Sequence, residues 1–156
     1  MSSVLTTQPV ETLWFLDNAV RIHAEGSNWS LTEASGHPWD MVPLHVHHDE
    51  DEVFHVVEGE LELFLDGNVF RLGAGQVVVA PRGVPHAYRV CSPEPARWLA
   101  LASETFAQFV RALSRPAETD GLPEPSGPPT PVQVAALSDC AARFGIEILG
   151  PPPFAP

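Results

Sequence analysis

Apolar residues that recur at every second position, in short segments separated by turn-forming residues, constrain this chain more than any other feature. The pattern covers most of residues 11 to 102, where Gly, Pro, Asn and Asp stand between the segments. A period of two matches strands with one buried face, and closely spaced turns match antiparallel pairing. The sequence therefore predicts an all-β fold of antiparallel strands.

Local sequence places two hairpins and one buried strand. Residues 12–16 and 19–23 are predicted to pair around Asp-Asn at 17–18. Asp-Gly at 66–67 predicts a second tight turn, because glycine readily takes the positive φ that such turns require. Residues 76–80, QVVVA, are almost continuously apolar, which predicts a strand buried on both faces.

Helical patterns follow the predicted strands. Ser103 is the expected N-cap of a helix whose apolar stripe over residues 106–113 should pack on the exterior of the β structure. Residues 116–131 are proline-rich and predict an extended linker that forms neither a strand ladder nor a helix. Thr130 is the expected cap of a second helix, with proline at its first position, that ends at Gly145.

We expect a single folded domain, because 156 residues suffice for one ordinary core. Residues 1–115 would form the β structure with its following helix, and residues 116–131 would form the linker. Residues 132–156 would supply a C-terminal helix and tail packed on the same domain.

The charge of the chain opposes polyanionic partners. Its formal net charge is -12, from 20 acidic and 8 basic residues, so nucleic acid and anionic membrane surfaces would repel it. The start of the chain lacks a basic region followed by an apolar segment, and we expect a cytoplasmic protein. Cys91 and Cys140 lack metal-type spacing and are expected to be free thiols.

Residues 43–54, PLHVHHDEDEVF, combine three histidines with four carboxylates. His45 and His47 lie two positions apart, so on a strand both imidazoles point to the same face. His48 is out of phase with that pair, and residues 49–51 form a hydrophilic run typical of a solvated turn. The segment is therefore either a metal site or a polar loop between two strands.

Glu52 begins the next apolar segment and shares a face with Phe54 and Val56. A carboxylate that points into apolar packing needs a partner, and a cation held by the two preceding histidines would supply one. Imidazole with carboxylate suits transition metals better than calcium or magnesium. His86 follows a bend rich in proline and glycine and could bring a third imidazole from another strand, although spacing alone does not establish this.

Two motifs resemble those of the cupins, a family of small antiparallel β-barrels. The first has the order His, one residue, His, three or four residues, Glu, six residues, Gly, and is matched by His45, His47, Glu52 and Gly59. The second has the order Gly, five residues, Pro, one residue, Gly, two residues, His, and is matched by Gly75, Pro81, Gly83 and His86. Trp39 and Val90 depart from a glycine and an asparagine that often flank these motifs.

The resemblance implies a double-stranded β-helix, which is an antiparallel jelly-roll barrel, with short C-terminal helices. It also implies one divalent transition metal, Fe, Mn, Ni, Co, Cu or Zn, held by His45, His47, Glu52 and His86. The chain is more loosely similar to single-barrel quercetin 2,3-dioxygenase-like cupins, which implies a small-molecule substrate and O2. In that chemistry Glu52 would be catalytic and accept the proton of a flavonol hydroxyl. Cupin barrels commonly dimerise, so we expect a homodimer.

Five residues are candidates for the substrate pocket. They are Trp39, Met41, Phe54, Val56 and Tyr88. The first two lie in a loop before the first motif, and the others share a face with a predicted metal ligand.

Two alternatives to a dioxygenase stay open on the sequence. The same ligands would serve an isomerase, decarboxylase or lyase that uses the metal as a Lewis acid without O2. A non-enzymatic protein that binds a small molecule through its metal is the other alternative.

Overall fold

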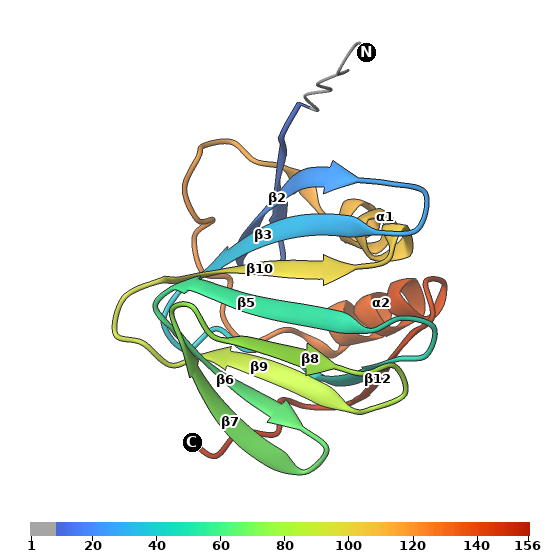
Figure 1. Cartoon of the computed structure of the whole chain (residues 1–156). Helices are drawn as coiled ribbons and strands as arrows, with labels where there is room; N and C mark the ends of the chain where they lie inside the picture. The colour runs from blue at the N-terminus through green and yellow to red at the C-terminus, as the bar shows by residue number, and fades with distance from the viewer. Residues whose placement is uncertain (1–8) are drawn as a thin grey trace, which may run out of the picture.

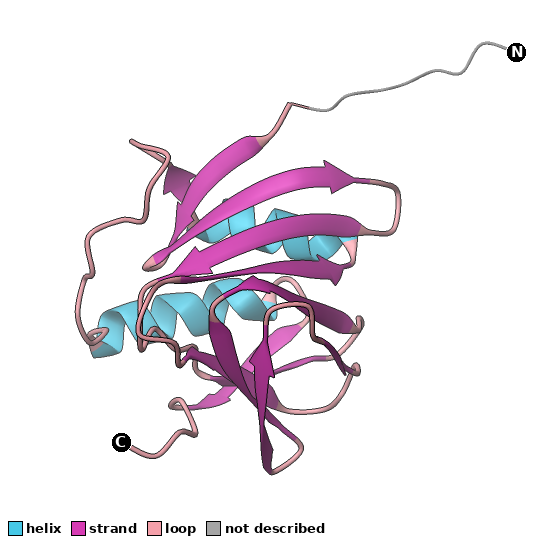
Figure 2. Ribbon diagram, turned by 60° about the vertical axis from the view of Figure 1, so that its left-hand side comes forward, coloured by secondary structure: helices cyan, strands magenta, loops and turns pink. Residues whose placement is uncertain are grey.

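A computed structural model describes residues 9–156 and shows two antiparallel sheets that face each other. One sheet has the order β11-β1-β2-β3-β10-β5-β8, and the other has the order β12-β4-β9-β6-β7. The two sheets lie one above the other in Figure 1, with both helices on one side of the barrel. Figure 2 shows the helices against the concave side of the strands. The predicted all-β class is confirmed.

Both sheets are built from short strands. The first sheet contains β1 (Glu11–Phe15), β2 (Asn18–Glu25), β3 (Ser30–Gly36), β5 (Glu52–Glu58), β8 (Val77–Ala80), β10 (Ala96–Ala102) and β11 (Arg115–Pro116). The second sheet contains β4 (Leu44–His47), β6 (Glu60–Leu65), β7 (Asn68–Gly73), β9 (His86–Val90) and β12 (Ile146–Gly150). The helices are α1 (Glu104–Leu113) and α2 (Pro131–Ala142).

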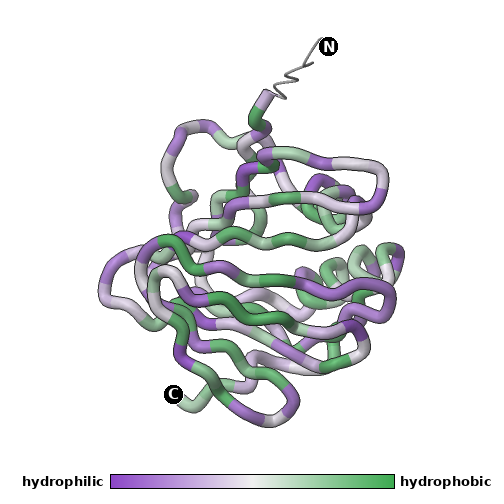
Figure 3. Tube along the Cα trace, viewed as in Figure 1, coloured by the Kyte–Doolittle hydropathy of each residue, from purple (hydrophilic) through white to green (hydrophobic). Residues whose placement is uncertain are grey.

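The core lies between the two sheets and follows from the period of two. Along β5, Phe54 and Val56 are buried while the residues between them are half-buried. Leu61 and Leu63 on β6 face Trp98 on β10 across the same interior. Figure 3 shows hydrophobic and hydrophilic residues alternating along these strands. The hydrophobic effect from burying one face of each sheet is the main contribution to the stability of the barrel.

Both predicted hairpins form. Asp66 and Gly67 take φ values of 48° and 80° and connect β6 to β7, as expected for a two-residue turn. The β1–β2 turn lies one residue earlier than predicted, because Phe15 pairs with Asn18. Leu16 therefore occupies the left-handed region, with a φ of 53°.

The prediction that residues 76–80 are buried on both faces is wrong. Strand β8 is at the end of its sheet, and Val77 and Val79 are 56% and 46% exposed. A continuous apolar run indicates that both faces resemble a core, but it does not tell whether another layer covers the outer face. The exposed valines leave an apolar surface along this edge.

The two helices begin as the sequence predicts. The Ser103 side chain accepts a hydrogen bond from the Thr105 N–H at the start of α1, and Thr130 forms a capping box with Gln133 at the start of α2. Among residues 9–156, neither helix has the length and apolar content needed to span a membrane.

The proline-rich segment is fastened to the barrel. The Trp14 indole donates to the carbonyl of Gly121 at 2.9 Å, and the His37 ring donates to the carbonyl of Pro123 at 2.8 Å. Pro116 pairs with Leu13 as part of β11, so the prediction that residues 116–131 join no ladder is wrong at its first residue. The boundaries proposed for this segment stay a prediction.

Candidate metal centre

Strands from both sheets bring four side chains to one point inside the barrel. His45 and His47 come from β4, Glu52 from the start of β5 and His86 from the start of β9. Their potential ligand atoms all lie within 4.8 Å of one another. His45 pairs directly with His86 across β4 and β9, which explains how a distant part of the sequence reaches the histidine pair.

Distances within the cluster are short and the cluster is shielded from solvent. Glu52 Oε2 lies 3.1 Å from His86 Nε2 and 3.5 Å from His47 Nε2. The rings of His45 and His86 have centroids 4.4 Å apart. His47, Glu52 and His86 are buried, and His45 is partly buried.

Hydrogen bonds at Nδ1 fix the orientation of each imidazole. His45 Nδ1 donates to the Pro43 carbonyl at 2.8 Å, and His86 Nδ1 donates to the Val84 carbonyl at 3.0 Å. A carbonyl only accepts, so the proton is on Nδ1 and the lone pair of the neutral ring is on Nε2. His47 makes the equivalent bond to a carboxylate.

The Nε2 lone pairs of the three imidazoles repel one another and repel the nearby carboxylate oxygen of Glu52, unless a cation lies among them. Protonated imidazoles or a metal ion would remove that repulsion. Three imidazoles and one carboxylate are also a donor set typical of transition-metal sites. The residues therefore fit a transition-metal ion.

The pKa values follow from burial and from the neighbouring charges. Burial, reinforced by the other imidazoles, lowers the pKa of His45 to about 3. Burial also lowers the pKa of His47, but the hydrogen bond to Glu50 and the charge of Glu52 outweigh it, so the net direction is upward. Burial raises the pKa of Glu52, but the hydrogen bond that a protonated His86 donates and the charges of protonated imidazoles outweigh it and lower that pKa.

Glu50 does not belong to a solvated turn, and the prediction that placed it there is wrong. Its side chain is buried, with only 7% of the residue exposed, while its neighbours His48, Asp49 and Asp51 are exposed as expected. Glu50 Oε1 accepts from His47 Nδ1 at 2.8 Å. The strand period does not extend into this loop, so it gave no signal for the inward direction of Glu50.

An apolar cavity of about 70 Å³ adjoins three of the four clustered side chains, namely His45, His47 and Glu52. Its aromatic wall comes from β1, β9 and α1 and consists of Phe15, Tyr88, Phe106 and Phe109. Its aliphatic wall includes Leu137 from α2 and Ile146 and Ile148 from β12. The apolar stripe of α1 thus faces the cavity and does not lie on the barrel exterior as predicted.

The predicted pocket residues have different positions. Tyr88 lines the cavity, and its hydroxyl donates to Asn18 Oδ1 at 2.7 Å. Burial, followed by the charge of Glu52, raises the pKa of Tyr88, so the phenol keeps its proton. Phe54 and Val56 are not among the residues that line the cavity, because they pack in the core between the sheets.

Trp39 and Met41 also do not line the cavity. Both are exposed, and Trp39 lies under the Arg89 guanidinium, 5.7 Å from its ring centroid. Met41 forms an isolated antiparallel bridge with Arg89 of β9. The C-terminal residues close the cavity in their place, and the sequence pattern did not indicate this because their strand pairing is long-range.

Two facing antiparallel sheets around three histidines and one glutamate define a small β-barrel protein with an internal candidate metal centre. A model of the cupin domain matches residues 37–102, a segment that contains all four clustered side chains. An RmlC-like cupin from Shewanella frigidimarina has a similar structure, with a TM-score of 0.56, 21% identity, and coverage of 67% of this chain and 90% of that chain. The chain therefore contains a match to the cupin domain and has a cupin-type fold.

Two relatives are similar in sequence over part of the chain. Quercetin 2,3-dioxygenase of Bacillus subtilis (strain 168) is 42% identical over 67 residues, which are 43% of this chain and 20% of that protein. Polyketide synthase CurC of Streptomyces cyaneus is 38% identical over 60 residues, 38% of this chain and 39% of that protein. The matched segment thus spans well under half the length of either relative.

Proposed function

We propose that this protein is a metal-dependent dioxygenase, similar to quercetinases, that acts on a small aromatic or flavonol-like compound. The observation that carries the proposal is the position of the His45, His47, Glu52 and His86 cluster beside an aromatic-lined cavity. The partial similarity to a quercetin 2,3-dioxygenase supports the choice of reaction.

The cofactor would be one divalent transition metal, Fe, Mn, Ni, Co, Cu or Zn, held by the four clustered side chains. When bound, it would lower the pKa of a substrate hydroxyl and provide positions for dioxygen. Glu52 Oε2 faces the centre and would accept the hydroxyl proton. Phe106 and Phe109 would hold the aromatic ring and keep water away from the reacting atoms.

The size of the cavity favours the smaller members of this substrate class. Ligand pockets usually measure about 300–1,000 Å³, whereas this cavity measures about 70 Å³. A single phenolic ring would need only local movement of side chains. A flavonol would require the wall formed by Leu137 and Ile148 to move outward.

Oxygen consumption tests the proposal directly. The protein would be loaded separately with each of the six metals, freed of excess metal, and supplied with catechols and flavonols in an oxygen electrode. We expect oxygen uptake equal to substrate loss with one of the metals. His86→Ala should lose both bound metal and uptake, whereas His55→Ala, out of phase with Glu52 on β5, should keep both. The absence of stoichiometric metal from the loaded protein would refute the proposal.

A non-oxidative reaction is the second candidate, because the similar polyketide synthase CurC is named as a synthase and not as an oxygenase. The same four ligands would then polarise an oxygen of the substrate in an isomerisation, decarboxylation or lyase reaction. Turnover without oxygen in an anaerobic chamber would favour this candidate. A metal-loaded protein that binds phenols tightly and never transforms them would indicate a non-enzymatic binding protein.

We also propose that the chain forms a homodimer through the outer face of its larger sheet. A row of paired apolar residues crosses four strands of this sheet: Leu31 on β3, Leu101 on β10, Val53 on β5 and Val79 on β8. The row ends at β8, which is the edge strand of the sheet. Two copies with a net charge of -12 repel each other, so close association requires a charge-poor surface such as this row.

The free thiols of Cys91 and Cys140 suit the reducing cytoplasm, which we propose as the location of this protein.

A further inference from the structure

The three imidazoles of the candidate metal centre differ in their Nδ1 partners. His45 and His86 each bond a neutral carbonyl two residues earlier in the chain. His47 bonds Glu50 Oε1 at 2.8 Å, and both side chains are buried. Among these three, His47 alone has a charged partner at Nδ1, which makes it the stronger electron donor at Nε2.

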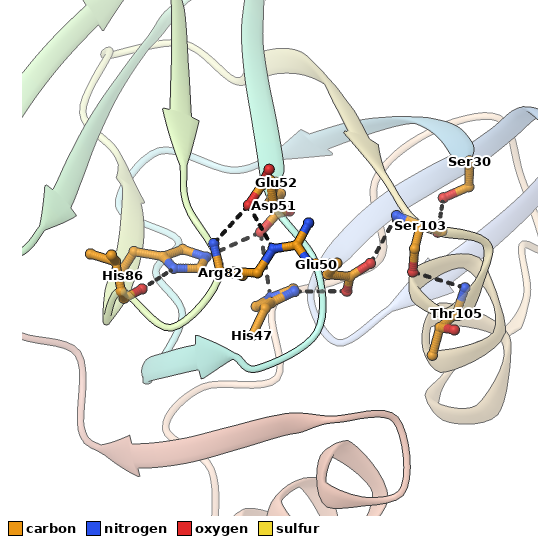
Figure 4. A network of polar contacts seen from close by, with 10 residues as sticks. Ser30, His47, Glu50, Asp51, Glu52, Arg82, His86, Ser103 and Thr105 are labelled. Atoms are coloured by element: carbon orange, nitrogen blue, oxygen red, sulfur yellow. Dashed lines mark hydrogen bonds and ion pairs between the residues drawn. The ribbon is translucent and has the colours of Figure 1, made fainter. Parts of the chain in front are cut away.

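Both carboxylate oxygens of Glu50 are engaged. Glu50 Oε2 accepts from the backbone N–H of Ser103 at 2.8 Å. Figure 4 shows this carboxylate between the His47 ring and the beginning of α1. A buried carboxylate is costly unless its oxygens are bonded, and the positive end of a helix stabilises it further.

Ser103 is itself held in place. Its side chain caps α1 by accepting from the Thr105 N–H at 3.2 Å, and its carbonyl accepts from the Ser30 hydroxyl at 2.6 Å. These contacts join Glu50 to α1 and to β3, far from the loop that carries it. The orientation of Glu50 is therefore set by residues outside the loop that contains it.

Helix α1 also reaches the cavity. Phe106, three residues after the cap, lies with its ring centroid 5.9 Å from that of His47 and lines the cavity. The His47 ring is thus held by Glu50 at one nitrogen and by Phe106 along its side. Both supports depend on where α1 begins.

We propose that Glu50 is a positioning residue of the metal centre, which holds the His47 imidazole with Nε2 toward the ligand cluster and couples that ligand to the start of α1. The proposal rests on the metal site of the proposed function. Glu50 contributes a second negative charge beside that of Glu52. Together with three neutral imidazoles, the two carboxylates balance the two positive charges of a divalent cation. Partners of this kind typically change metal affinity by about 10–100-fold.

Cobalt binding tests the role of Glu50. Co(II) affinity would be measured by competition with a chromophoric chelator for the wild type, Glu50→Gln and Glu50→Ala. We expect affinity to fall about tenfold in Glu50→Gln and up to about 100-fold in Glu50→Ala, with a changed visible absorption spectrum of the bound cobalt. Glutamine has nearly the same shape and separates loss of charge from loss of packing.

Asp49→Asn is the matched control, because it removes one negative charge from an exposed neighbour in the same loop. We expect its cobalt affinity and spectrum to match those of the wild type. An equal loss of cobalt affinity in Asp49→Asn would show that Glu50 acts only through its negative charge and not through its contact with His47. That result would overturn the proposal. Wild-type affinity and spectrum in both folded Glu50 variants would also overturn it, while leaving the metal site intact.

A readout without metal completes the test. Histidine ¹⁵N chemical shifts of the metal-free protein report the tautomer of each ring, and we expect His47 to carry its proton on Nδ1 in the wild type. Glu50→Ala should change the ¹⁵N shifts of His47 and leave those of His86 unaltered. Identical His47 shifts in the two proteins would contradict the proposal. Failure of the wild type to bind any metal would instead remove the metal site and the positioning role together.

Discussion

Neighbouring histidines of one strand differ in proton affinity because their surroundings differ. His45 has only a carbonyl at Nδ1 and is surrounded by other imidazoles, which together with burial holds its pKa at about 3. His47 has Glu50 at Nδ1, and its pKa is raised. A metal ion would therefore compete with a proton more strongly at His47 than at His45.

Acid should destabilise the metal-free protein through His45. In the unfolded chain this histidine binds a proton below its ordinary pKa of 6.5, whereas the folded protein binds it only near pH 3. Stability is therefore lost as the pH falls, by about 2 kcal/mol between about pH 7 and about pH 5 for this residue. Urea unfolding at these two pH values measures the change.

The comparison with His45→Asn isolates this contribution. The raised pKa of His47 has the opposite sign, since it stabilises the fold below pH 6.5 and that stabilisation is lost as the pH rises through the folded pKa. We expect the variant to lose about 2 kcal/mol less than the wild type over the same interval. Equal losses would show that His45 titrates normally in the folded protein.

The four clustered residues were predictable from the sequence, whereas Glu50 was not. His45, His47, Glu52 and His86 were predicted from strand phase and from two motifs, and the structure brings them together. Glu50 lies in a loop whose side chains have no fixed period, and its second partner is 53 positions away at Ser103. Long-range contacts of loop residues leave no local pattern to detect.

At the scale of elements, β12 is the main neighbour of the strand that carries two candidate ligands. Strand β4 pairs with β9 at the single position of His45 and His86. It pairs with β12 at four positions, among them His47 with Ile146 and His45 with Ile148. The C-terminal strand therefore holds β4 in register and supplies part of the cavity wall.

Ile146→Ala should weaken both the fold and the metal site. Ile146 is 2% exposed, so the substitution leaves a cavity beside β4 and should lower the free energy of unfolding by about 2–4 kcal/mol. We expect weaker Co(II) binding as well, because His47 loses the packing of its strand partner. Denaturant unfolding and chelator competition measure the two effects.

Leu149→Ala provides a control on the same strand. Leu149 is 43% exposed, and its truncation should change stability by less than about 1 kcal/mol. If both substitutions had the same small effect, β12 would not support β4 in solution.

The strand β12 was not predicted from the sequence, in contrast to both hairpins. A hairpin pairs residues that are neighbours in the chain, and its turn residues mark it. Strand β12 follows a helix and pairs with residues about one hundred positions earlier in the chain. None of its pairing partners is a neighbour in the sequence. Its prediction would have required knowledge of the free edge of β4.

At the scale of the whole molecule, the outer face of the larger sheet combines apolar side chains with an unpaired strand edge. Val77 and Val79 are exposed on β8, and Leu101 is exposed on β10. An exposed apolar edge favours association with another chain. The location of the ligand cluster inside the barrel leaves this face free for that purpose.

Val79→Lys should disrupt the proposed homodimer. A lysine on the edge strand places a charge and its hydration shell where a second copy would pack. We expect self-association to weaken by at least about tenfold, measured by sedimentation velocity over a range of concentrations. Val69→Lys, at an exposed site on β7 of the other sheet, should leave self-association unchanged. A monomeric wild type would exclude the homodimer.

The pairing of β4 with β12 also sets an order of events during synthesis. All four clustered side chains have been made once residue 86 is added. At that point β4 still lacks β12, the strand that supplies four of its five residue pairings. That partner follows only when residues 146–150 are made. On the ribosome, the imidazoles should therefore remain loosely arranged until this last strand is added. Any metal would then be selected only after β12 has paired with β4 and the barrel has closed around the site.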